Sequence, residues 1–164
     1  MIVCVISAEW ASVFVNFISG VVIALILAYV VPKKLSDCRT LKDFYIDEFR
    51  SIKADYNSLC KEICLGSCSA SEIKENFKQL NIKLTDVQWS VNKSLSIDLQ
   101  LEKYIIETQI YVTNSEEINE QYTNGSVDFS SLTKHKILEL QDVFNRNMLS
   151  AIAAINYGSI LKNT

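Results

Sequence analysis

The sequence predicts an all-α protein with one N-terminal transmembrane helix followed by an antiparallel four-helix bundle. Residues 10–31 carry no charged side chain, whereas charged residues are frequent after Pro32. Apolar residues beyond that point recur at spacings of three and four, which is the period of an amphipathic helix. The whole chain holds one proline and four glycines, and strand-like alternation is absent after Val31. We therefore expect residues 1–32 to form an apolar segment with a membrane span, and residues 33–164 a helical bundle.

The stretch WASVFVNFISGVVIALILAYVV at residues 10–31 is the predicted span. A helix of that length measures about 33 Å, against about 30 Å for the hydrocarbon core of a bilayer. Trp10 and Tyr29 stand near its two ends, where amphipathic rings favour the membrane interface. The stretch is too long for an ordinary core helix, so lipid is its expected partner.

The flanks of the span predict its orientation. No lysine or arginine precedes Lys33, and Lys34 and Arg39 follow closely. Basic residues stay on the cytoplasmic side, so we expect the N-terminus outside and the bundle in the cytoplasm. A cleaved signal peptide is the alternative, but the chain lacks a basic n-region, and Tyr29 to Pro32 does not resemble a cleavage site.

Small or polar residues recur every fourth position through the span and form one stripe on a helix. They are Ala8, Ser12, Asn16, Gly20, Ala24 and Ala28. Such stripes let membrane helices approach closely and hydrogen-bond, so a homo-oligomer is expected. Asn16 matters most, because its carboxamide would lack partners in lipid. Two alternatives stay open: a chance run of small residues, and a pore in which Asn16 and Ser12 face water.

The bundle is predicted as four helices in up-down-up-down order. The first spans about Ser36 to Leu65, with a break at Pro32 before it and Gly66 as its stop. The second begins at the capping box Ser69 to Glu72 and ends near Leu95. The third spans Leu99 to Tyr122. The fourth is capped by Asp128 or Ser130 and ends at Gly158. The apolar lines include Leu41, Tyr45, Phe49, Tyr56, Phe77, Leu84, Ile105, Tyr122, Phe144 and Met148.

No metal site or cofactor is predicted. Cys60, Cys64 and Cys68 are four residues apart, and the single histidine, His135, lies far along the chain between two lysines. Zinc requires four suitable ligands, so a reduced structural role in the cytosol is the preferred interpretation. If the bundle lay outside the cell, disulfides would become possible. The net charge of −3 gives no basis for expecting DNA binding.

The last helix holds Arg146 followed by the polar Asn147. An arginine and a polar neighbour in the last helix of a small bundle resemble the HEPN family, whose active members dimerise to cleave RNA. In that family's motif, four to six residues separate the arginine from a histidine. Here the positions for that histidine hold Ala151, Ile152 and Ala153. The resemblance therefore implies a degenerate motif without its general acid–base residue, and no catalytic residue is assigned. An ordinary surface charge is the alternative for Arg146.

The anchor and bundle together resemble the small single-span membrane accessory proteins of type VI-B CRISPR systems, which carry a degenerate HEPN-like bundle. The resemblance implies a bacterial inner (plasma) membrane location and an antiviral defence role without enzymatic activity. It also implies an oligomeric pore that depolarises the membrane on a cytoplasmic signal, with a cytosolic RNA-guided nuclease or another RNA-linked protein as partner.

Two other classes of function stay open. A membrane-tethered adaptor would recruit a cytosolic partner and would tolerate replacement of Asn16 by leucine. A divergent membrane-bound ribonuclease would depend on Arg146. A pore predicts ion leakage that depends on the span.

Overall fold

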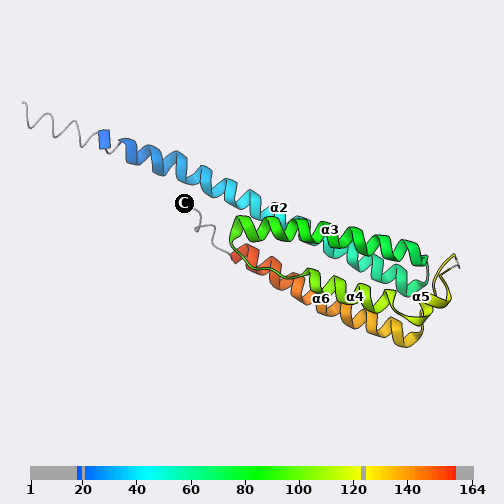
Figure 1. Cartoon of the computed structure of the whole chain (residues 1–164). Helices are drawn as coiled ribbons and strands as arrows, with labels where there is room; N and C mark the ends of the chain where they lie inside the picture. The colour runs from blue at the N-terminus through cyan, green and yellow to red at the C-terminus, as the bar shows by residue number, and fades with distance from the viewer. Residues whose placement is uncertain (1–17, 20, 123–124, 158–164) are drawn as a thin grey trace, which may run out of the picture. The chain divides into compact units, whose positions relative to one another are not determined.

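The computed structural model describes residues 18–19, 21–122 and 125–157 (Figure 1). It divides the chain into two units, Met1–Leu41 and Lys42–Thr164, which we describe separately. All regular elements in the described ranges are helices. The prediction of an all-α fold with a helical bundle is therefore confirmed.

The first unit contains a change of helical pitch before its proline. Residues 18, 19 and 21–25 are helical, the π-helix η1 covers Ile26–Val30, and helix α2 covers Val31–Leu65. The Val31 N–H donates to the Ile26 carbonyl, five residues back, as in a π turn. Proline lacks an N–H and its ring crowds the preceding turn, so the wider turn accommodates Pro32. The predicted break at Pro32 is wrong, because α2 includes it in its first turn.

Among the residues that the structure describes, no helix combines the length and the apolar character that crossing a membrane requires. The predicted span of residues 10–31 falls only partly in this set, since residues 10–17 and residue 20 lie outside it.

The second unit contains the rest of α2 and four further helices. They are α3 (Ala70–Leu95), α4 (Glu102–Thr113), α5 (Glu116–Glu120) and α6 (Ser131–Tyr157). The predicted third helix is divided in two, because the chain leaves helical geometry at Asn114. Ser115 then caps α5 by accepting a hydrogen bond from the Ile118 N–H at 3.3 Å.

Local capping chemistry sets most of the other helix limits. The Ser69 hydroxyl accepts from the Glu72 N–H while the Glu72 carboxylate accepts from the Ser69 N–H, which is the predicted capping box. Gly66 has a φ of +67°, a left-handed conformation that ends α2. Ser130 caps α6 through the Thr133 N–H at 3.2 Å. Asp128 instead accepts from the Lys134 ammonium at 2.8 Å.

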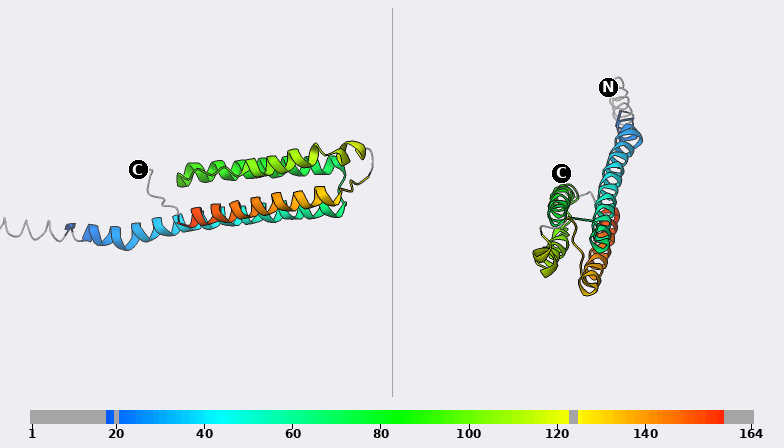
Figure 2. Two further views of the ribbon diagram at one scale, coloured as in Figure 1. Left: turned by 90° about the horizontal axis from the view of Figure 1, so that it is seen from below. Right: turned by 90° about the vertical axis from the view of Figure 1, so that its right-hand side faces the viewer.

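Hydrogen bonds between helices show that sequential helices run antiparallel. From α2 to α3, Tyr45 bonds to Ser90 and Asp55 to Lys83, so residue numbers rise along one helix and fall along the other. The same opposite order relates α3 to α4, where Asn81 meets Gln109 and Gln88 meets Glu102. In the bundle, α2 and α6 lie side by side as one layer, and α3 and α4 as the other (Figure 2).

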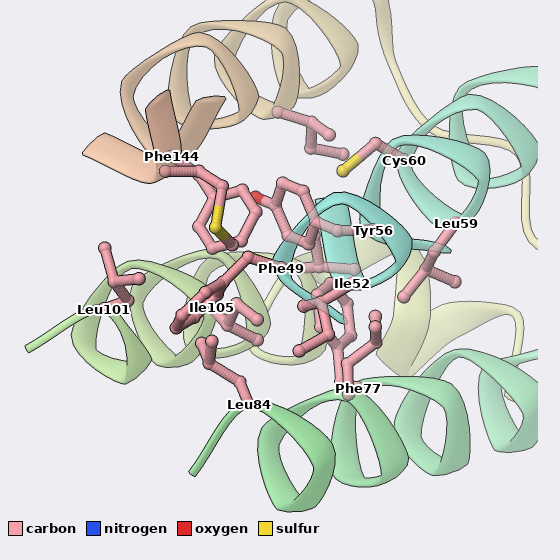
Figure 3. Packing of buried hydrophobic residues seen from close by; sticks show 14 of the residues in the cluster. Phe49, Ile52, Tyr56, Leu59, Cys60, Phe77, Leu84, Leu101, Ile105 and Phe144 are labelled. Carbon is pink, nitrogen blue, oxygen red and sulfur yellow. The ribbon is translucent and has the colours of Figure 1, made fainter. Parts of the chain in front are cut away.

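The core lies between these two layers. Most of its large apolar side chains come from α2, α3, α4 and α6, and Ile118 of α5 joins them. Tyr56 of α2 and Phe144 of α6 are in contact, with ring centroids 4.3 Å apart. Figure 3 shows Phe77 and Leu84 of α3 and Ile105 of α4 pointing toward the same region. Most of the predicted apolar lines are buried. Leu41 and Tyr122 are exposed, so their predicted places in the core are wrong.

Candidate functional site

The predicted association stripe is described only at its C-terminal end. Ser12, Asn16 and Gly20 lie outside the described residues. Ala24 lies on the helical segment 21–25 and Ala28 on η1, and both are exposed. The larger side chains around them are exposed as well, including Val22, Leu25 and Val30. The described part of the predicted span therefore presents apolar side chains that the other described residues of its unit leave exposed.

Arg146 and Asn147 have different environments although they are neighbours on α6. The Arg146 guanidinium pairs with the Asp142 carboxylate one turn earlier at 3.0 Å, and its side chain is 70% exposed. Asn147 is half-buried: its amide donates to the Val143 carbonyl at 2.8 Å, and its carbonyl oxygen accepts from the Tyr104 hydroxyl at 3.0 Å. Asn147 thus joins α6 to α4, while Arg146 faces solvent.

The three cysteines near the end of α2 are held as thiols. Burial raises the pKa of Cys60 to about 12. Burial also raises the pKa of Cys64, and the pKa of Cys68 is raised by burial and by the Glu62 carboxylate. Because the thiolate is the reactive and metal-binding form, these sites are poorly suited to either role at neutral pH.

His135 is exposed and lies 3.3 Å from the Glu139 carboxylate on the next turn of α6. Within the described ranges, no group of three or more histidine, cysteine or acidic side chains is arranged to hold a metal ion.

The Glu117 carboxylate joins α5 to the start of α6 through hydrogen bonds. Its carboxylate accepts from the Ser130 N–H at 3.1 Å and from the Thr133 hydroxyl at 2.8 Å. Partial burial would raise the pKa of this carboxyl, but the hydrogen bonds to its charged form outweigh burial and lower the pKa to about 2. The ionised carboxylate is therefore part of the folded bundle.

This depressed pKa predicts acid sensitivity. A carboxyl whose pKa is lower in the folded state stabilises that state above its unfolded pKa, near 4.5, and the contribution is lost as pH falls toward about 2. We expect Glu117→Gln to remove about 1 kcal/mol of this pH-dependent stability, after allowance for solvent screening. The test is the midpoint temperature of thermal unfolding, measured from pH 6 to pH 2 in steps of about one pH unit. Glu116→Gln, on an exposed neighbour, is the matched control, and equal acid profiles for both variants would contradict the prediction.

An open groove of about 610 Å³ runs between α2 and α6 on the outside of their layer. Its walls combine apolar side chains with charged ones at the edge: Asp43, Ile46, Asp47, Arg50, Leu149, Ile152, Ala153, Asn156 and Tyr157. Leu149 is 55% exposed. The groove can accept an apolar group and has charges of both signs beside it.

The outer face of the other layer carries exposed apolar side chains. Trp89 of α3 projects outward and is 63% exposed, with the Lys93 ammonium 4.8 Å from the centre of its ring. Ile82 lies two turns earlier on the same face of α3, and Ile106 and Ile110 are exposed on the adjacent α4. Exposed apolar residues gathered on one face are typical of interaction surfaces.

Neither surface was predicted from the sequence. Trp89 is an apolar residue that lies outside the apolar line of its helix. This position is the sequence signal that could have identified the surface around it. The groove has no signal of this kind, because it depends on how α2 and α6 pair. We found no matching protein family, curated protein or solved structure.

Proposed function

We propose that this chain is a single-span protein of the bacterial inner membrane that assembles into an oligomeric pore. The uncharged stretch of residues 10–31 carries the proposal. In this proposal the N-terminus faces out, the bundle lies in the cytoplasm, and a cytoplasmic signal opens the pore and depolarises the membrane as an antiviral defence. The trigger is a cytosolic nuclease or another RNA-linked partner, as the resemblance to type VI-B accessory proteins implies.

Three features support a membrane location. The stretch is long enough as a helix to cross the hydrocarbon core. The first basic residues follow it directly. The described residues within it, including Val22, Ile23 and Leu25, expose their apolar side chains, and exposed apolar surface of this kind needs lipid or protein to cover it.

Assembly is supported by the small-residue stripe and by the bundle. One span per chain encloses no water path, so a pore requires several copies. The stripe of Ser12, Asn16, Gly20, Ala24 and Ala28 supplies close approach and a polar face. The bundle adds two exposed surfaces, the Trp89 face and the groove between α2 and α6.

Ion leakage from liposomes containing the full-length protein tests the proposal. We expect a discrete oligomer by light scattering in detergent and a leak that falls about tenfold or more in Asn16→Leu, because interhelical polar contacts contribute about 1–2 kcal/mol at each copy. Ile18→Leu, on another face of the same stretch, is the matched control. A monomeric or dimeric protein without leakage would overturn the pore and leave the membrane-tethered adaptor as the leading function.

A further inference from the structure

We propose that copies of this chain pack side by side, with Trp89 of one copy seated in the groove between α2 and α6 of the next. The inference rests on the self-assembly proposed above and names the surfaces that carry it. Its partner is a second copy of the same chain, held through an apolar knob, a groove whose lining mixes polar and apolar side chains, and flanking charges.

The knob is formed by a large side chain that its own bundle leaves uncovered. Trp89 stands on the outer face of α3, and Ile82, Ile106 and Ile110 extend the apolar surface beside it across α3 and α4. Tryptophan is the residue type most typical of energetically dominant contacts, because it buries a large area with few rotatable bonds.

The groove is large enough to receive the knob, and part of its lining is apolar. Its volume of about 610 Å³ is open to the outside, and Ile152, Ala153 and Leu149 supply apolar walls. The groove belongs to the α2–α6 layer and the knob to the α3–α4 layer, which form opposite sides of the bundle (Figure 2). A contact between two different faces is head-to-tail, and such contacts form closed rings when the rotation between copies closes.

The two surfaces lie at the same level along the bundle. The Tyr45 hydroxyl and the Ser90 hydroxyl are 2.8 Å apart, which places Trp89 at the level of Ile46 in the groove wall. The Lys42 ammonium bonds the Asn156 carbonyl at 3.0 Å and places the end of α6 beside the same part of α2. Parallel bundles can therefore join knob to groove without sliding along their length.

Charges on the two faces are complementary in that arrangement. Asp86 and Lys93 lie about one turn to either side of Trp89 on its exposed face. Because α3 runs antiparallel to α2, Asp86 lies at about the level of Arg50, and Lys93 at about the level of Asp43. Both of these α2 residues border the groove. Each charge thus meets an opposite charge on the neighbouring copy, whereas a shift of two turns would place like charges together.

The mass of the full-length protein in detergent, measured against concentration, tests the interface. Trp89→Ala is expected to raise the midpoint concentration for assembly at least about tenfold. Leu132→Ala, on a side chain that is 80% exposed and outside both surfaces, is expected to leave it unchanged. Asp86→Arg and Arg50→Asp are each expected to weaken assembly, and the double variant is expected to restore it, because the opposite charges meet again with reversed signs.

The outcomes separate this interface from the proposed function. A wild-type protein that stays monomeric at all concentrations overturns both. A wild-type oligomer that Trp89→Ala leaves intact, with no recovery in the double charge variant, overturns this interface while self-assembly through the span still stands. Circular dichroism of each variant confirms that the bundle remains folded.

Discussion

Replacing Phe144 with alanine is expected to lower the free energy of unfolding of the bundle by about 3–5 kcal/mol. Phe144 is fully buried, and its ring contacts Tyr56 with centroids 4.3 Å apart and an interplanar angle of 48°. Removing it deletes buried apolar area and the aromatic contact, and it leaves a cavity between the two helical layers. A loss of this size is a large part of the stability of a typical domain.

Urea unfolding of the full chain in detergent, followed by circular dichroism, measures this loss. Leu132→Ala removes a similar apolar side chain from an exposed position on the same helix and should change the unfolding free energy by less than about 0.5 kcal/mol. If the two variants unfolded alike, the bundle would not depend on the Tyr56–Phe144 contact at its centre.

Helix limits could be predicted where the signal is local. Ser69 and Glu72 satisfy each other's backbone groups within one turn, and Gly66 needs no partner to adopt a left-handed conformation. The division of the third helix was missed, because apolar residues continue at helical spacing on both sides of Asn114. At Pro32 the general rule failed, since a π turn before the proline relieves the crowding that normally ends a helix.

The candidate surfaces depend on pairing that the sequence pattern does not encode. Periodicity distinguishes the buried face of α6 from its exposed face, but it does not show that Leu149 and Arg50 border one groove. For Asn147, the motif resemblance indicated a functional position, whereas its hydrogen bonds with Tyr104 and Val143 give it a place between two helices. The stripe in the predicted span stays a prediction, since Ser12, Asn16 and Gly20 lie outside the described residues.

A second large effect is expected from Gln88→Leu in α3, where the Gln88 side chain bonds to the start of α4. Gln88 is buried: its carbonyl oxygen accepts from the Leu101 N–H at 2.6 Å, and its amide donates to the Glu102 carboxylate. The leucine would leave a buried N–H without an acceptor and a carboxylate without its donor, so a loss of about 1–3 kcal/mol is expected. Gln79→Leu, which removes an exposed amide on the same helix, is the matched control.

Hydrogen exchange at the Leu101 amide distinguishes this effect from a general loss of stability. The amide should exchange faster in Gln88→Leu even when compared at equal global stability, because the turn between α3 and α4 opens locally before the bundle unfolds. Since the turn joins the two antiparallel helices of one layer, its loosening should spread to the first residues of α4 and leave α6 protected. Uniform acceleration across all helices would instead show that Gln88 contributes only to the global core.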